Sequence, residues 1–181
     1  DIILTGVAEK PDAEMLVIGD ERITWAEMRD RAGQVANALR ASGVGPQERI
    51  AYIDKNGAEY FELAFGCSLA NSVTVAVNWR LAPPEMAYIV NDAQSKVLVI
   101  HEEFADHLAA FEADLTHTDT ILVIGDHDTH ASYAGWRDAH SPDCEVTPAG
   151  GDDVSMQLYT SGTTGLPKGA QLTNDNFKTL F

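Results

Sequence analysis

The 181-residue sequence is poor in cysteine and in long hydrophobic stretches, and each shortage excludes a class of protein. The two cysteines, Cys67 and Cys144, form no CxxC pair, which favours a reducing compartment. No apolar run approaches the roughly 20 residues that a membrane-spanning helix requires, and the best candidate is residues 64–70. The N-terminus lacks a basic segment followed by an apolar one, so nothing supports secretion. We therefore expect a cytoplasmic protein.

Positive charge is also scarce. Twelve Lys and Arg residues stand against 28 Asp and Glu residues, which gives a formal net charge of −16 at pH 7. Between residues 101 and 153 there are thirteen acidic side chains and one basic side chain, Arg137. Such a field repels nucleic-acid backbones and anionic lipids, so we expect no nucleic-acid partner and interpret this stretch as solvated surface. A local basic patch elsewhere leaves peripheral membrane contact open, and the oligomeric state stays open as well.

The hydrophobic pattern alternates between strand-like and helix-like segments. Expected strands cover residues 15–18, 49–53, 73–77, 96–100, 121–124 and 154–159. Helices are expected between them: after a capping box formed by Thr24 and Glu27, after Gly57, from Pro83, and around Leu108. The second of these helices is expected to bury Tyr60, Phe61, Leu63, Ala64, Cys67 and Leu69. Alternating strands and helices predict an α/β fold with a mainly parallel sheet layered with helices.

The most informative segment follows the last of these strands. Residues 159–169 read Tyr-Thr-Ser-Gly-Thr-Thr-Gly-Leu-Pro-Lys-Gly. Glycines allow the backbone N–H groups to approach an anion, hydroxyls can bind phosphate oxygens or a divalent cation, and lysine supplies a positive charge. The P-loop pattern fails because Pro167 precedes Lys168, and the dinucleotide pattern GxGxxG is absent. The chain is expected to return as a second strand through Ala170 and Leu172.

This segment resembles the signature loop of the superfamily of AMP-forming acyl-CoA synthetases, adenylation domains and luciferases. The sequences at residues 24–28 and 78–81 and the strand at Lys96 also resemble landmarks of that superfamily. Residues 77–81 look most like a fatty-acid–CoA ligase. The resemblance implies that residues 1–181 are the N-terminal portion of an AMP-binding domain, with the rest of that domain and a C-terminal lid domain beyond them.

The resemblance also implies a reaction. ATP and a carboxylic acid, most simply a fatty acid, would form an acyl-adenylate, and coenzyme A would then take the acyl group. The implied cofactors are ATP, Mg²⁺ and coenzyme A. The loop residues implied to hold the β- and γ-phosphates are Ser161, Gly162, Thr163, Thr164, Gly165 and Lys168. Lys168 is also implied to act in catalysis, and Thr160 to bind both the nucleotide and Mg²⁺. The fragment is expected to be inactive alone.

Other interpretations stay open at this point. The loops of aryl-CoA ligases, of adenylation domains that load a carrier protein and of luciferase-like oxygenases look alike, and a non-catalytic nucleotide- or partner-binding module is a further alternative. Cys67 is interpreted as a packing residue. Trp79 and Arg80 are interpreted as structural, with side chains that point apart. The acidic, histidine-containing loop at residues 125–130 is interpreted as a solvated turn and not as a metal site.

Overall fold

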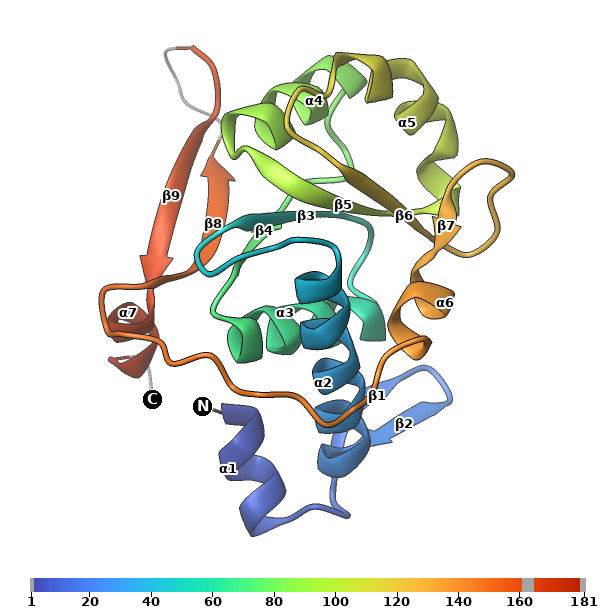
Figure 1. Ribbon diagram of the computed structural model, residues 1–181. Helices are drawn as coiled ribbons and strands as arrows, with labels where there is room; N and C mark the ends of the chain where they lie inside the picture. Colours follow the sequence, from blue (N-terminus) through green and yellow to red (C-terminus); the bar gives the residue numbers. More distant parts are fainter. Residues whose placement is uncertain (1, 161–164, 180–181) are drawn as a thin grey trace.

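The computed structural model describes residues 2–160 and 165–179, which form a layered α/β structure (Figure 1). The described residues build a seven-stranded sheet in the order β7-β6-β5-β3-β4-β8-β9, and every neighbouring pair is parallel except β8 with β9. The strands are β3 (Arg49–Ile53), β4 (Val73–Ala76), β5 (Ser95–His101), β6 (Thr120–Ile124), β7 (Ala131–Ser132), β8 (Val154–Thr160) and β9 (Lys168–Thr173). The predicted fold class is confirmed.

Helices cover both faces of this sheet (Figure 1). On one face lie α4 (Pro83–Asp92) and α5 (Ala105–Phe111); on the other lie α2 (Trp25–Ala41), α3 (Ala58–Ala70) and α6 (Tyr133–Asp138). The remaining elements are α1 (Ile2–Glu9), the hairpin of β1 (Glu14–Ile18) and β2 (Glu21–Thr24), two short turns η1 (Glu102–Phe104) and η2 (Glu112–Asp114), and α7 (Asn174–Lys178). The sequence analysis missed α1 and α6.

The predicted capping box opens α2. The Thr24 hydroxyl accepts a hydrogen bond from the Glu27 N–H at 3.2 Å, and the Glu27 carboxylate accepts one from the Thr24 N–H at 2.8 Å. Two of the first free N–H groups of the helix end are therefore satisfied. The helix then buries its predicted apolar stripe, which includes Met28, Val35 and Leu39.

The central strands bury both of their faces. In β5, Leu98 and Ile100 belong to the apolar cluster under α4 and α5, whereas Val97 and Val99 belong to the cluster under α2 and α3. This alternation follows from the two-residue period of a strand, and it explains why the strand reads as continuously apolar in the sequence.

A buried carboxylate joins three helices on the second face. Glu62 in α3 is 1% exposed, and it pairs with Arg31 of α2 at 2.9 Å and with Arg137 of α6 at 2.6 Å. A carboxylate at this depth is tolerated because both of its oxygens meet a guanidinium. The sequence analysis gave α3 an apolar stripe and did not single out Glu62.

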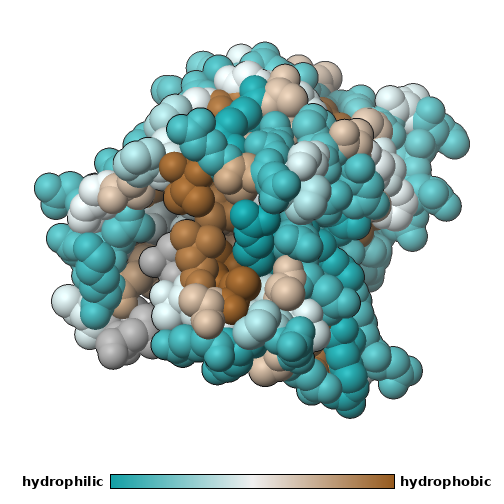
Figure 2. Space-filling view, turned by 60° about the horizontal axis from the view of Figure 1, so that its bottom comes forward, coloured by the Kyte–Doolittle hydropathy of each residue, from teal (hydrophilic) through white to brown (hydrophobic). Residues whose placement is uncertain are grey.

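The expected burial of α3 needs a correction. Tyr60, Phe61 and Ala64 are only half-buried. Figure 2 shows a hydrophobic band enclosed by hydrophilic surface on the side that carries the lower elements of Figure 1. A third apolar cluster lies there between α1, α2 and α3, with Phe61 and Phe65 at its margin. Among the described residues, no helix has the length and apolarity needed to span a bilayer.

Candidate functional site

The segment singled out from the sequence forms a hairpin at one end of the sheet. Strand β8 runs parallel to β4 and β9 returns antiparallel to β8, so the end of β8 at Thr160 and the start of β9 at Lys168 lie at the carboxyl edge of the parallel strands (Figure 1). Of the predicted phosphate-binding residues, Thr160, Gly165 and Lys168 are described. The others lie outside the described residues: Ser161, Gly162, Thr163 and Thr164. Open α/β sheets bind their ligands at this edge.

Thr160 and Lys168 lie directly opposite each other at the end of the hairpin ladder. Both side chains are exposed, and the Lys168 ammonium has no hydrogen bond or ion pair with any residue that the structure describes. Next to the tip, Gly165 has a φ of +154°, a conformation that side chains rarely adopt. A hydroxyl and a free cation at the same point can bind an anionic oxygen.

Tyr159 anchors the end of β8 to the neighbouring helix. Its hydroxyl donates a hydrogen bond to Asp92 Oδ2 at 2.6 Å and accepts one from Gln157 Nε2 at 2.9 Å. Burial, reinforced by the hydrogen bond to the Asp92 carboxylate, raises the pKa of Tyr159 above its ordinary value. The hydroxyl therefore stays protonated and remains a donor at neutral pH.

Gly169 makes room for this arrangement. It is the cross-strand partner of Tyr159, and a Cβ atom added there would lie 2.5 Å from Gln157 Nε2 and 2.9 Å from Tyr159 Cζ. Any side chain at residue 169 would therefore displace the tyrosine ring or the glutamine amide. The glycine that follows Lys168 in the motif thus has a steric role in the hairpin.

A cavity of about 700 Å³ lies at the same edge of the sheet, where the chain leaves β3 and β4. The residues that line it are Tyr52, Asp54, Lys55, Asn56, Tyr60, Ala76, Val77, Asn78, Trp79 and Arg80. After β3 the chain crosses through α3 to β4, and after β5 it crosses through α5 to β6 on the opposite side. Neighbouring strands with opposite connections mark the point where such sheets leave a crevice for ligands.

Two cationic side chains that line this cavity lie against the Trp79 ring. The Arg80 guanidinium lies 4.1 Å from the Trp79 ring centroid, and Lys55 Nζ lies 5.3 Å from it. The prediction that Trp79 and Arg80 point apart is therefore wrong. Lys55 also pairs with Glu103 at 2.6 Å, and the pair joins the segments that follow the neighbouring strands β3 and β5. This ion pair lowers the pKa of Glu103. Arg80 has no anionic partner among the described residues.

Sequence reasoning missed Lys55. It lies two residues after the end of β3, and a polar residue shortly after a buried parallel strand is the signal that places a side chain at the carboxyl edge.

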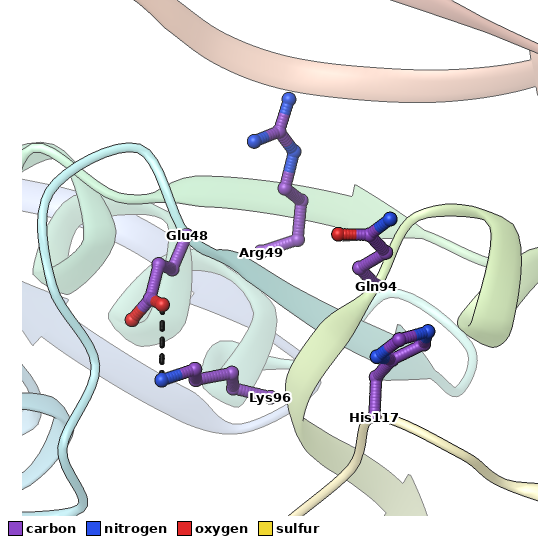
Figure 3. A pocket seen from close by; sticks show the side chains of 5 residues that line it. All are labelled: Glu48, Arg49, Gln94, Lys96 and His117. Carbon is purple, nitrogen blue, oxygen red and sulfur yellow. Dashed lines mark ion pairs between the residues drawn. The ribbon is translucent and has the colours of Figure 1, made fainter.

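A smaller cavity of about 150 Å³ lies at the opposite, amino edge, lined by Glu48, Arg49, Gln94, Lys96 and His117 (Figure 3). Its basic groups are engaged within the protein. Lys96 points toward Glu48 and pairs with it at 3.0 Å, and Arg49 donates to the Gln47 carbonyl at 2.7 Å. Partial burial acts against ionisation of Glu48, but the Gly45 N–H and Lys96 together lower its pKa. This edge therefore offers fewer free charges to a ligand.

Metal binding finds limited support in the described part of the chain. No group of three or more His, Cys, Asp and Glu side chains there could hold a metal ion, and this includes the loop at residues 125–130. Thr160 could contribute one hydroxyl ligand. A single ligand suits Mg²⁺, which keeps several waters and binds mainly through substrate phosphates.

Cys67 is a buried packing residue. Burial raises the pKa of the Cys67 thiol to about 11, so the thiol stays protonated. It lies inside the apolar cluster under α2 and α3, which confirms the prediction that Cys67 is a packing residue.

Comparison with known proteins matches residues 5–180 to the family described as AMP-binding enzymes. A fatty acid–[acyl-carrier-protein] ligase, ScoC, from Streptomyces coeruleorubidus is 34% identical over 172 residues, which cover 93% of this chain and 31% of that protein. A feruloyl-CoA synthase from an Amycolatopsis species is 37% identical over 166 residues, or 92% of this chain and 31% of that protein.

The solved structure of the anthranilate CoA ligase AuaEII in complex with anthranoyl-AMP superposes with a TM-score of 0.94 and 27% identity. The match covers 99% of this chain and 35% of that one. The chain therefore spans about a third of the length of each protein compared.

Proposed function

The chain belongs to the family of AMP-binding enzymes, and on that premise we propose that it supplies the phosphate-binding part of an AMP-forming acid–thiol ligase. One observation carries the proposal: the hairpin of β8 and β9 brings Thr160 together with Lys168, which has no ion pair with any described residue, at the carboxyl edge of the sheet. Residues 1–181 are proposed to be the N-terminal portion of the AMP-binding domain, with the adenine and acyl pockets and a lid domain supplied by further sequence. We place the protein in the cytoplasm.

The proposed reaction has two steps. A carboxylate oxygen attacks the α-phosphorus of ATP, the bond to pyrophosphate breaks, and an acyl-adenylate forms. A thiol sulfur then attacks the acyl carbon and AMP leaves. The phosphate-binding loop (residues 160–168) is proposed to grip the β- and γ-phosphates in the first step, where Lys168 would offset the negative charge that develops on the departing pyrophosphate.

Mg²⁺, when bound, would neutralise phosphate charge, with the Thr160 hydroxyl as one of its ligands. Phosphoryl chemistry depends mainly on such neutralisation and on alignment.

The cavity next to the ends of β3 and β4 suits the thiol substrate of the second step. Coenzyme A and a carrier-protein arm both deliver their thiol on a phosphorylated stem. Arg80, which lacks an anionic partner among the described residues, could pair with such a phosphate, and the exposed side of Trp79 could pack against the apolar part of the stem.

Fatty acid remains our proposed acid, with coenzyme A as the thiol. The name of one relative, a fatty acid–[acyl-carrier-protein] ligase, supports the acid and favours a carrier protein as the alternative thiol, whereas the feruloyl-CoA synthase keeps aromatic acids as candidates. A non-catalytic nucleotide-binding module is the alternative from another class. Activity of a full-length protein that contains this chain, screened with acids of graded chain length and with both thiols, separates these possibilities.

The decisive test of the loop is Lys168→Ala in the full-length protein. Acid-dependent exchange of pyrophosphate into ATP should fall by about 100-fold, the size of the loss of one transition-state contact. Lys178→Ala is the matched control, because Lys178 is an exposed lysine of α7 that pairs only with Asp175 among the described residues. An unchanged exchange rate in Lys168→Ala would contradict the role assigned to the loop.

A further inference from the structure

The phosphate-binding loop starts one residue after Tyr159, so whatever fixes Tyr159 also fixes Thr160, the described residue at the start of the loop. The Tyr159 hydroxyl is held by Asp92, 67 positions earlier in the chain and in a different element. Asp92 is the last residue of α4. The buried side chains Met86, Ile89 and Val90 of this helix anchor it in the apolar cluster between the sheet and α4 and α5. The hydrogen bond therefore connects the end of β8 to a rigidly packed helix.

Local helix preferences do not account for an aspartate at this position. The C-terminal end of a helix carries partial negative charge, so a carboxylate there is unfavourable for the helix. No basic residue in the last turn of α4 compensates for it. A residue that opposes its local preference points to a role elsewhere in the structure.

The neighbours of Tyr159 are also arranged around its hydroxyl. Gln157 is only 6% exposed, and its amide nitrogen donates to that hydroxyl, whereas its Oε1 finds no partner among the described residues. Gly169 leaves the space that the ring occupies. A buried amide with an unsatisfied oxygen is unfavourable, so the structure keeps the contact with Tyr159 at some cost in stability.

We propose that Asp92 is a positioning residue for the nucleotide phosphates. By accepting the hydrogen bond of the Tyr159 hydroxyl, it fixes the end of β8 and with it the positions of Thr160 and of its cross-strand partner Lys168. Asp92 itself touches no substrate. The inference rests on the proposed function, because it assigns a supporting residue to the same loop.

The test uses the full-length protein and measures its two half-reactions separately. In Asp92→Ala, kcat/KM for ATP in pyrophosphate exchange should fall by about fivefold, a modest effect because the Asp92 carboxylate is exposed and water competes for it. Tyr159→Phe should give the same loss, and the double variant should be no worse than either single variant. Thioester formation from preformed acyl-adenylate should not change, since that step involves no β- or γ-phosphate.

Two controls separate positioning from general damage. Asp92→Asn keeps an acceptor oxygen and should restore kinetics to within about twofold of the original protein. Asp92→Ala should change Tm little, because the loss of the hydrogen bond to Tyr159 is offset by removal of an unfavourable charge from the end of α4.

The outcomes are distinct. Equal loss in both half-reactions, or no rescue by Asp92→Asn, would overturn the positioning role. If Lys168→Ala slows exchange but Asp92→Ala does not, the inference fails while the proposed function stands. If Lys168→Ala also leaves exchange unchanged, the proposed function itself fails.

Discussion

The two edges of the parallel sheet differ in how their charges are used. At the amino edge, Lys96 is paired with Glu48 and Arg49 bonds to a backbone carbonyl beside a cavity of about 150 Å³. At the carboxyl edge, Lys168 and Arg80 have no anionic partner among the described residues, and the cavity there is about 700 Å³. Cations without internal partners can pair with substrate anions, so the asymmetry supports our proposal that the carboxyl edge binds the ligand.

The largest expected effect concerns the reaction of the 181-residue chain alone. We expect it to form no detectable acyl-adenylate from ATP and acid, because in our proposal this chain supplies only the phosphate-binding part of the ligase. Mass spectrometry of the reaction products checks this, with a full-length protein containing the chain as the positive control. Measurable adenylate would show that this edge suffices for catalysis and would contradict the assignment of residues 1–181 as an incomplete domain.

Removing the buried carboxylate of Glu62 should destabilise the packing of α2, α3 and α6, which supports both edges of the sheet. Glu62→Ala leaves Arg31 and Arg137 without their common partner and should lower the free energy of unfolding by about 3 kcal/mol. Denaturant unfolding measures this, with exposed Glu9→Ala as the control. A change as small as that of Glu9→Ala would mean that the three helices are held by packing alone.

Filling the space beside Tyr159 should damage the carboxyl edge selectively. Gly169→Val places side-chain atoms where the Gln157 amide and the Tyr159 ring now lie, and we expect kcat/KM for ATP in the full-length protein to fall by about tenfold. Gly150→Ala is the matched control, because a Cβ there meets its nearest neighbour at an ordinary 3.7 Å. Similar kinetics in the two variants would show that the hairpin does not depend on Gly169.

Arg80 tests the second cation of the carboxyl edge. Arg80→Ala should raise KM for the thiol substrate by about fivefold and leave pyrophosphate exchange unchanged, since loss of one exposed ionic contact is modest. Steady-state kinetics with coenzyme A and with a carrier protein measure it, and Arg22→Ala at an exposed ion pair far along the chain is the control. A lower rate of pyrophosphate exchange with an unchanged KM for the thiol would mean that Arg80 contacts the nucleotide and not the thiol substrate.

The smallest effect is expected at the amino edge. Lys96→Ala should leave kinetics for every substrate within about twofold, because the pair with Glu48 is structural and partly exposed. The folded-state pKa of Glu48 is lowered, so the pair stabilises the fold at neutral pH and this contribution is lost as the pH falls through the lowered pKa. Unfolding at a series of pH values should therefore show the variant converging with the original protein under acidic conditions. A large loss of ATP-dependent activity would erase the contrast between the edges.

Local sequence patterns were sufficient to predict the central strands and helix α2. The strand at residues 49–53 and the capping box of Thr24 and Glu27 each depend on near neighbours in the chain, and the structure confirms both. The motif at residues 159–169 was recognisable because its residues are continuous in the sequence.

The contacts that the sequence did not reveal join distant segments. Glu62 reads as a polar interruption in a helix until α2 and α6 bring Arg31 and Arg137 to it. Asp92 and Tyr159 are 67 positions apart, and Lys55 meets Glu103 only because β3 and β5 are neighbours in the sheet. Such pairs depend on strand order, which hydrophobic periodicity does not encode.

The central claim is that the hairpin of β8 and β9 grips the terminal phosphates of ATP. A crystal structure of a full-length protein containing this chain, in complex with ATP and Mg²⁺, tests it most directly. We predict the β- and γ-phosphates within hydrogen-bonding distance of Lys168 Nζ and of the loop that follows Thr160. Terminal phosphates bound at the amino edge, or elsewhere away from this hairpin, would contradict the account.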